Sequence, residues 1–164
     1  MRHFYMDASA LTKRYAPEPG TPLIHYLFGQ ASDRLYLLNL GFAEVAWSLV
    51  RKKNTGRIST TLLSQALVNL VAEIIHDSSV TKVVPDNTLV SAALPLIDVH
   101  SLNATDAVML RSALDYAGQL RSIGDDLVLV ASDQRLLRAA QAEGLVIFNP
   151  ETQSQAELDV LLGP

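Results

Sequence analysis

Cysteine is absent from this sequence of 164 residues. A disulfide framework, a thiolate metal site and a cysteine nucleophile are therefore excluded. Any metal ion must be bound by oxygen atoms or by the four histidines, which are scattered singly along the chain. A lone histidine is more often a packing or surface residue than a ligand. Oxygen is thus the main class of metal ligand that the composition offers.

Long apolar segments are also missing. Asp7 interrupts the N-terminal segment before an apolar signal region can form, and no uncharged apolar stretch approaches the length that spans a bilayer. We therefore expect a cytoplasmic protein that makes no contact with a membrane.

An excess of positive charge is missing as well. The formal net charge is -4, so the chain as a whole does not attract nucleic acid, and polyanion binding would need a local basic patch. One candidate is the segment RKKNTGR at 51–57, which has four basic residues and no acidic one. The same composition also suits a solvated helix end, where cations interact favourably with the negative end of the helix dipole.

The length and composition are sufficient for one core. With 49% hydrophobic and only 18% charged residues, the chain can bury one substantial core, and it is too short for two typical domains. We expect one domain over residues 1–150, with residues 151–164 forming a tail or short helix of the same domain.

Short apolar segments alternate with helical patterns along the chain. Five segments rich in β-branched or aromatic residues are typical of buried strands: 3–6, 35–39, 80–84, 127–131 and 145–148. Apolar residues recur at helical spacing between some of them, within 42–50, 62–74 and 108–117. Gly144 follows the run RAAQAE as a helix C-cap would. The alternation predicts a doubly wound α/β sheet that is mostly parallel.

Four acidic residues occur near predicted strand ends or helix starts. Asp7 follows the first strand and Asp133 follows the fourth, while Glu44 falls in the first turn of one predicted helix and Asp106 at the start of another. Ligands of open α/β sheets bind outside the carboxyl ends of the strands, where the strand order reverses. We therefore expect these acids at the ligand-binding edge. By contrast, 125–126 precedes the fourth strand and is expected at the opposite edge, as loop solvation.

Each of these acids also has a simple structural explanation. Asp7 and Asp133 can cap helices, Asn103 with Asp106 resembles a capping box, and Glu44 is favoured near the positive end of a helix dipole. Capping does not require the acids to converge, and carboxylates 4 Å apart repel by about 4 kcal/mol at an effective dielectric of 20. A convergent cluster favours a cation. Oxygen-only ligands suit Mg²⁺ or Mn²⁺, with phosphodiester hydrolysis as the natural chemistry.

Four segments resemble, in order, the successive motifs of PIN-domain ribonucleases, and specifically of the VapC toxin family. The segments are MDASALTKRYAPEPG, LNLGFAEVAWSLVRKKNTGRIS, HSLNATDAVMLRSAL and LVLVASDQRLLRAAQAEGLVIFNP. The resemblance runs from about residue 4 to about residue 150. It implies a PIN-like five-stranded parallel sheet of order 3-2-1-4-5 flanked by helices, with an acidic pocket that coordinates Mg²⁺ or Mn²⁺ and cleaves RNA.

The resemblance also assigns residues to this pocket. It places Asp7, Glu44, Asp106 and Asp133 there, with Ser9 as a supporting hydroxyl. Asp7 and Asp106 are our first choices as direct metal ligands. The other two acids would orient waters, bind a second ion or serve as the base.

Substrate and partner contacts are predicted more coarsely. Arg14, Arg51 and Lys52 are candidates for contacts to RNA phosphates, whereas Tyr15 and Trp47 are expected in the core or an interface rather than as base-stacking platforms. Proteins similar to VapC are usually homodimers that a small antitoxin holds inactive. We therefore expect an RNA substrate, a homodimer and an antitoxin partner.

Two other functions stay open. A receiver-like phosphoacceptor domain has a similar sheet, and Asp86 follows the third strand, where such a domain carries its phosphorylated aspartate. The sequence lacks the paired acids after the first strand and, at 149–150, the lysine after the fifth that a receiver would have. A noncatalytic module that binds RNA or a partner protein is the second alternative.

Overall fold

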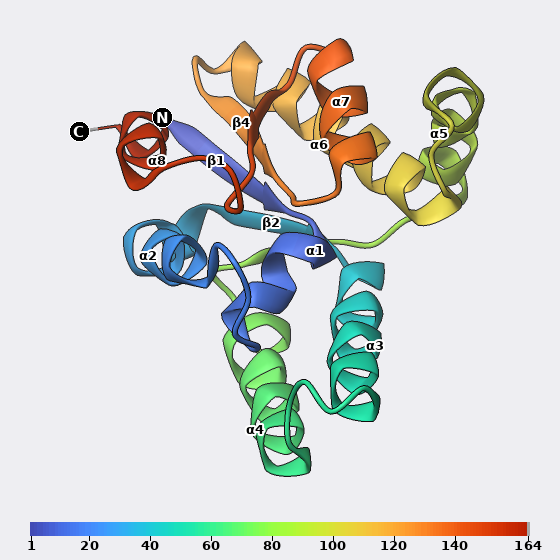
Figure 1. The fold of residues 1–164 in the computed structure, drawn as a ribbon. Helices are drawn as coiled ribbons and strands as arrows, with labels where there is room; N and C mark the ends of the chain where they lie inside the picture. Colours follow the sequence, from blue (N-terminus) through green and yellow to red (C-terminus); the bar gives the residue numbers. More distant parts are fainter. Residues whose placement is uncertain (164) are drawn as a thin grey trace.

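The computed structural model describes residues 1–163, and its centre is one parallel five-stranded sheet. The strands lie in the order β3-β2-β1-β4-β5 (Figure 1). Their bounds are β1 (Arg2–Met6), β2 (Leu35–Leu38), β3 (Thr81–Val83), β4 (Asp126–Val130) and β5 (Val146–Phe148). Every neighbouring pair is parallel. The five predicted strands, their direction and the PIN-like order 3-2-1-4-5 are therefore confirmed.

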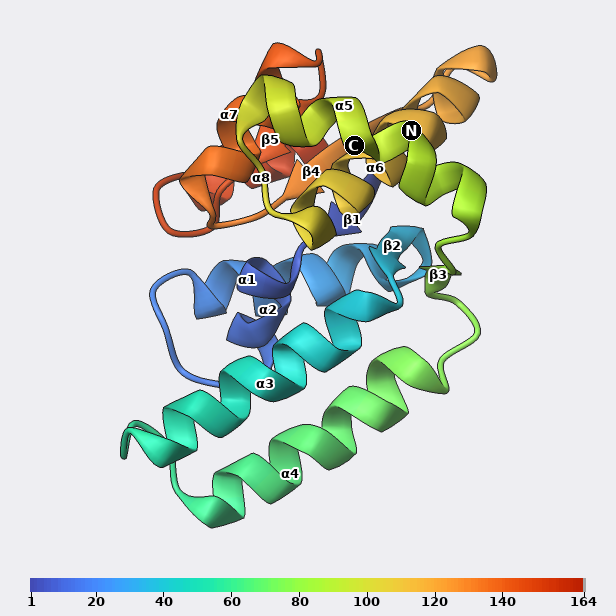
Figure 2. The same ribbon diagram turned by 90° about the vertical axis from the view of Figure 1, so that its right-hand side faces the viewer.

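Helices connect the strands and cover both faces of the sheet (Figures 1 and 2). They are α1 (Ala8–Leu11), α2 (Thr21–Ala31), α3 (Leu40–Asn54), α4 (Thr60–Leu70), α5 (Asn87–His100), α6 (Ala104–Ser122), α7 (Gln134–Ala142) and α8 (Gln155–Leu162). Two 3₁₀ turns, η1 (Thr12–Arg14) and η2 (Ser32–Arg34), and a π-helical turn, η3 (Val71–Ile75), complete the set. The helix α8 occupies part of the segment 151–164 that was expected to form a tail or a short helix. Among the described residues, no helix has the length and apolar character needed to cross a membrane.

The strands contribute side chains to two hydrophobic cores, one on each face of the sheet, because alternate side chains of a strand point to opposite faces. In β1, Phe4 and Met6 contact the core under α1, α2, α3, α4 and α8, whereas Tyr5 contacts the core under α5, α6 and α7. In β4, Val128 and Leu129 divide between the two cores in the same way. Burying a large apolar side chain stabilises the fold by roughly 1.5–3 kcal/mol. A strand that is buried on both faces, such as β4, reads as a continuous apolar segment, which makes it predictable from the sequence.

The pairing of β1 with β4 positions the functional edge of the sheet. Chain order runs outward from β1 through β2 to β3 on one side, and from β4 to β5 on the other. The strand order therefore reverses between β1 and β4. Met6 lies opposite Val130, and the backbone N–H of Asp7 donates to the Val130 carbonyl at 2.9 Å. The carboxyl ends of the two strands are thus held side by side.

The loop after η1 packs closely against the segment that follows β5. Gly20 has a φ of +86°, and a Cβ added there would lie 2.4 Å from the Pro150 carbonyl oxygen. Gly56 also has a positive φ, of +74°, but an added Cβ would meet nothing within 4 Å. Both glycines adopt the left-handed backbone conformation, which disfavours other residues. Only Gly20 also permits a close approach of two backbone segments.

We expect Gly20→Ala to destabilise the protein more than Gly56→Ala. The left-handed conformation costs both variants roughly 1–2 kcal/mol, and the clash with Pro150 adds about 1–3 kcal/mol to the first alone. Urea unfolding of the two variants and the parent protein measures the difference. Equal losses in the two variants would contradict the packing role of Gly20.

Candidate functional site

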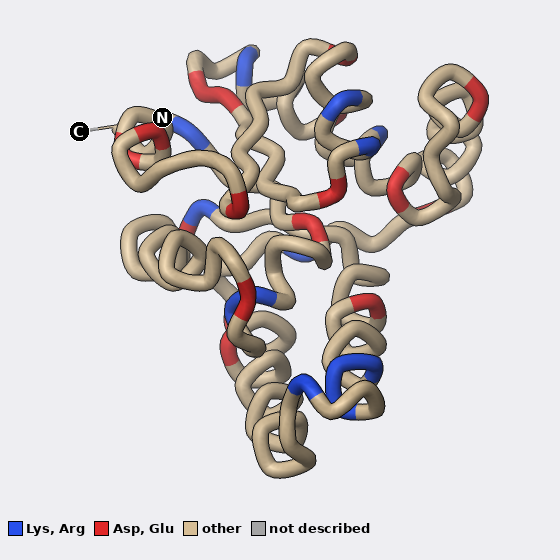
Figure 3. Tube along the Cα trace, viewed as in Figure 1, with Lys and Arg blue, Asp and Glu red and all other residues tan. Residues whose placement is uncertain are grey.

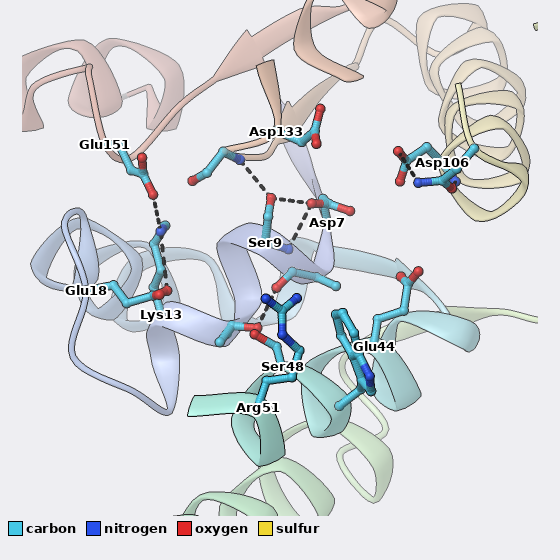
Figure 4. A pocket seen from close by; sticks show the side chains of 15 residues that line it. Asp7, Ser9, Lys13, Glu18, Glu44, Ser48, Arg51, Asp106, Asp133 and Glu151 are labelled. Atoms are coloured by element: carbon cyan, nitrogen blue, oxygen red, sulfur yellow. Dashed lines mark hydrogen bonds and ion pairs between the residues drawn. The ribbon is translucent and has the colours of Figure 1, made fainter. Parts of the chain in front are cut away.

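A cavity of about 490 Å³ lies where the carboxyl ends of β1 and β4 meet, and six carboxylates line it, among them the four acids singled out from the sequence (Figure 4). Asp7 follows β1, Glu44 comes from α3, Asp106 from the first turn of α6, and Asp133 precedes α7. The structure therefore brings together all four acids that the sequence singles out. Because they come from four separate elements, their convergence is a property of the fold rather than of any local motif.

Two of the acids cap helices as well as lining the cavity. Asp7 is the N-cap of α1, and its Oδ2 accepts from the backbone N–H of Ser9 at 2.8 Å. Asp133 is the N-cap of α7, and its Oδ1 accepts from Arg135 N at 2.8 Å and Leu136 N at 3.0 Å. The capping explanation is confirmed for both residues. Capping is compatible with a ligand-binding role, because these hydrogen bonds use only one oxygen of each carboxylate and leave the other available.

The other two acids are held differently. Asn103 caps α6 by accepting from Asp106 N at 2.9 Å, and its amide donates back to Asp106 Oδ2 at 2.8 Å. Glu44 is the fifth residue of α3, which begins directly after β2. The prediction that Glu44 lies in the first helical turn is wrong, because Asn39 already adopts the helical conformation. Glu44 thus lies beyond the positive end of the dipole.

Ser9 connects the two central strand ends. Its hydroxyl donates to Asp7 Oδ2 and accepts from the backbone N–H of Ser132 at 2.9 Å. The dashed lines in Figure 4 follow this chain from the segment after β4 to Asp7. The geometry gives Ser9 the supporting contacts that the resemblance implies for it.

Burial and the charges of neighbouring carboxylates raise the pKa values of Asp7, Glu44 and Asp106. Burial raises the pKa of Asp7, which is 8% exposed, and the neighbouring charge of Asp133 adds to the shift. Burial also raises the pKa of Asp106 to about 7, with further contributions from Asp7, Asp133 and Glu44. The pKa of Glu44 is raised by burial and by Asp7. A bound cation would reduce the repulsion between the carboxylates that contributes to these raised pKa values.

The donor set fits a hard divalent cation. Over residues 1–163, no three carboxylate or imidazole side chains converge closely enough to form a ready-made metal site. Mg²⁺ tolerates this arrangement, because it keeps several waters and is usually bound through only one or two carboxylates. The cavity presents carboxylate, hydroxyl and amide oxygens and no sulfur or imidazole. This chemistry suits Mg²⁺ or Mn²⁺ and disfavours softer metals.

The sequence reasoning missed a buried lysine in the cavity wall. Lys13 is 2% exposed, and its ammonium donates to Glu151 at 2.5 Å and to Glu18 at 3.5 Å. Lys52 also pairs with Glu18. Lys13 and Glu151 are 138 positions apart, so no local pattern signals the pair. This network joins the loop that contains Gly20 to the segment after β5.

The predicted phosphate-contact residues divide between cavities. Arg51 lines the acidic cavity, and Lys52 lines a neighbouring hollow that shares Arg51. Arg14 lies elsewhere: its guanidinium donates to Glu73 at 3.0 Å and bonds His25 at 2.9 Å. The structure does not group Arg14 with the acids, because η1 directs its side chain toward η3.

Two aromatic predictions have different outcomes. Tyr15 is 6% exposed and belongs to the core, as predicted. Trp47 is 60% exposed and lines the acidic cavity, so of its two expected placements the core is wrong, and the interface stays a prediction. The reason is its position on α3, where Val45 and Leu49 take the buried face.

The two acids at 125–126, at the start of β4, lie at the opposite edge, as predicted, but they are not simply solvated. Asp125 accepts from the amino group of Met1 and bonds His3 Nε2 at 3.2 Å. Asp126 accepts from Arg121 Nε at 2.8 Å. Their expected role as loop solvation is therefore wrong, because each has a cationic or imidazole partner.

Strand order excludes the receiver-like alternative. Asp86 follows β3, the edge strand, and caps α5 by accepting from Leu89 N at 2.8 Å. A receiver-like sheet would place the third strand beside the first, whereas β2 lies between them here. Asp86 consequently does not line the acidic cavity.

Comparison with known proteins supports the fold independently. No protein-family model matches the sequence, and no curated protein resembles it significantly. Among solved structures, PAE2754 from Pyrobaculum aerophilum is 24% identical with a TM-score of 0.58, over 93% of this chain and 94% of that one. FitAB bound to an IR36 DNA fragment is 15% identical with a TM-score of 0.57, over 92% and 97%. FitAcB from Neisseria gonorrhoeae is 17% identical with a TM-score of 0.56, over 92% and 99%. At these identities the likeness shows a shared fold along nearly the whole chain.

The raised pKa of Asp106 predicts a pH-dependent stability. As the pH rises from its ordinary pKa of 3.8 to about 7, the unfolded chain releases a proton that the folded chain retains, so the free energy of unfolding falls. In EDTA, we expect the free energy of unfolding of Asp106→Asn to fall less with rising pH than that of the parent protein. The variant should melt at a higher temperature than the parent protein at pH 8 and at about the same temperature at pH 4. Thermal scans across this range provide the measurement.

Asp86→Asn is the matched control for this experiment. Like Asp106, Asp86 lies at the start of a helix, where its carboxylate accepts from the backbone N–H of Leu89, but it lies outside the acidic cavity. Asparagine caps about as well as aspartate, so this variant should follow the parent protein at every pH. A pH profile of Asp106→Asn that parallels the parent profile would show that the carboxylates are not coupled as described.

Proposed function

We propose that the protein is a Mg²⁺- or Mn²⁺-dependent endoribonuclease that hydrolyses RNA phosphodiester bonds, as the toxin of a VapBC-like toxin-antitoxin pair. The observation that carries the proposal is the convergence of Asp7, Glu44, Asp106 and Asp133 on one cavity at the switch point of the sheet. Structural capping explains single acids, but it does not explain why four acids from four elements share a cavity at an energetic cost.

The roles of the four acids follow from how each is held. Ser9 fixes one oxygen of Asp7, and Asn103 fixes one oxygen of Asp106, which orients both carboxylates as direct ligands. Glu44 and Asp133 would orient waters, bind a second ion or accept a proton. When bound, a divalent cation supplies a water of lowered pKa and neutralises charge that develops on the phosphate oxygens. Arg51 lies in the same cavity wall and would bind a phosphate of the substrate.

RNA cleavage tests the proposal directly. We expect a mixed RNA substrate to be cleaved with Mg²⁺ and to survive with EDTA, because the carboxylates need a cation to act on a phosphodiester. Asp7→Asn and Asp106→Asn should each lower the cleavage rate by about a hundredfold or more. They should also reduce the rise in melting temperature that Mg²⁺ produces, since a ligand stabilises only in proportion to its binding to the native state.

Asp86→Asn is again the control and should keep both cleavage and the metal response. Cleavage that survives in both Asp7→Asn and Asp106→Asn would move the active site elsewhere. RNA binding with no cleavage by the parent protein, at any Mg²⁺ or Mn²⁺ concentration, would favour the noncatalytic alternative.

A homodimer and a small antitoxin are the partners in this proposal. Exposed apolar side chains on two helical faces support it: Val68, Val71 and Ile75 on α4 and η3, and Val90 and Leu94 on α5. Exposed apolar clusters of this kind often mark protein interfaces.

We expect light scattering to give twice the chain mass of 17.9 kDa for the purified protein. Val68→Glu and Leu94→Glu place a charge on one face each, so the variant that becomes monomeric identifies the dimer face. A monomer at high concentration, together with no small neighbouring gene product co-purifying with the chain, would contradict this part of the proposal.

A further inference from the structure

One face of α3 changes from acidic to basic along its length. Glu44, Ser48, Arg51 and Thr55 follow one another at helical spacings of three or four residues and therefore share a face. Glu44 lines the acidic cavity, and Arg51 lies about two turns further on, roughly 10 Å along the helix axis. Figure 3 shows the basic residues gathered at this end of α3 and in the turn after it.

A second cavity lies at the basic end. Its volume is about 260 Å³, and it is lined by Ser48, Arg51, Lys52, Thr55 and Arg57. Ser48 and Arg51 also line the acidic cavity, so the two cavities share a wall. We call the second one the basic cavity. A strand that has one phosphate among the carboxylates would thus reach a basic site without leaving this face.

The charges of the basic cavity are largely available to a ligand. No carboxylate lines it. Lys52 pairs with Glu18, whereas neither Arg51 nor Arg57 forms a salt bridge with any part of the described chain. Arginine binds phosphate through a planar fork of donors, which makes it the preferred residue for this anion.

The helix dipole does not account for this arrangement. Cations in the last turn of α3 are favoured by the dipole, but Arg57 lies beyond the end of the helix. Gly56 adopts a φ of +74°, and the backbone N–H of Arg57 then donates to the Lys52 carbonyl at 2.8 Å. This turn brings Arg57 back to the cavity that Arg51 lines.

An exposed tryptophan lies between the two sets of charges. Trp47 lines the acidic cavity and is 60% exposed, and the Arg51 guanidinium lies 4.5 Å from its ring centroid. With this exposure, most of the indole surface is open even with the guanidinium over the ring. Aromatic rings beside basic grooves are the platforms on which nucleic-acid bases stack.

We infer that Trp47 and the basic cavity form a subsite for the nucleotide next to the phosphate that lies among the carboxylates. One base stacks on the Trp47 ring, and the adjacent phosphate is bound by Arg51 and Arg57. This inference rests on the proposed function, because the acidic cavity supplies the position of the first phosphate. The ligand is a single-stranded segment, since the bases of a duplex are already stacked and have no free face.

Trp47 is the only tryptophan of the chain, so its fluorescence reports this contact directly. The probe is a short single-stranded 2′-O-methyl oligoribonucleotide, added to the full chain in EDTA so that binding is measured without hydrolysis. We expect saturable quenching with the same dissociation constant that fluorescence anisotropy of a labelled probe gives. The matching duplex should leave the tryptophan signal unchanged. Probe binding without quenching would overturn the stacking contact.

Two matched sets of variants separate the subsite from general charge attraction. Trp47→Ala should weaken probe binding roughly tenfold, and Trp47→Phe should lose less because phenylalanine still stacks. Arg57→Ala should weaken binding about tenfold and lower the salt slope by about 0.7, the share of one single-strand phosphate contact. Lys53 lies at the same helix end and carries the same charge, but it lines neither cavity. Lys53→Ala should therefore change the affinity for the probe less than about twofold.

The outcomes distinguish this inference from the proposed function. Equal losses from Arg57→Ala and Lys53→Ala, or parental affinity in Trp47→Ala, would overturn the subsite even if the protein cleaves RNA. If the parent protein never cleaves RNA but shows the quenching and the variant pattern described, the ribonuclease proposal fails and the nucleotide subsite stands. Docking of a partner protein at Trp47 predicts no response to the probe and would also overturn the inference.

Discussion

The parallel pairing of β1 with β4 is the constraint on which the rest of this site depends. It sets Met6 opposite Val130 and lets the backbone of Asp7 bond to the Val130 carbonyl. Two strands that are far apart in sequence then end at the same level, each followed by a helix whose N-cap is an aspartate. A register shift of one residue would send these side chains to the other face of the sheet.

The fold maintains this crowding of carboxylates with local hydrogen bonds. Capping amides, the Ser9 hydroxyl and the Asn103 amide each stabilise negative charge at one oxygen, which partly offsets burial. Lys13 contributes differently, because Glu18 and Glu151 neutralise it within the wall of the cavity. Within residues 1–163, no basic side chain forms a salt bridge with Asp7, Glu44, Asp106 or Asp133.

Local signals were sufficient to predict the strands and the four acids, and insufficient for contacts between distant segments. Buried strands and N-caps can be recognised from a few consecutive residues. In MDAS, for example, Met6 ends a strand and Asp7 caps the helix that follows. The helix α5 was not predicted, because Val90, Leu94 and Val99 are exposed apolar residues that blur its periodicity, and Pro95 interrupts the pattern. The Lys13 network and the direction of the Arg14 side chain depend on packing between segments, which no local window contains.

The order of the segments along the chain also determines when the site can exist. Asp133 follows Asp7 by 126 residues, and the Glu151 partner of Lys13 comes later still. Domains fold during synthesis as their segments emerge, at about 5–20 residues per second. Until β4 has been made, β1 has an unpaired edge and Asp7 has no neighbouring Asp133. A chain that stops before Asp133 therefore lacks the complete set of carboxylates, and any chemistry of this cavity begins only after β4 and Asp133 have been synthesised.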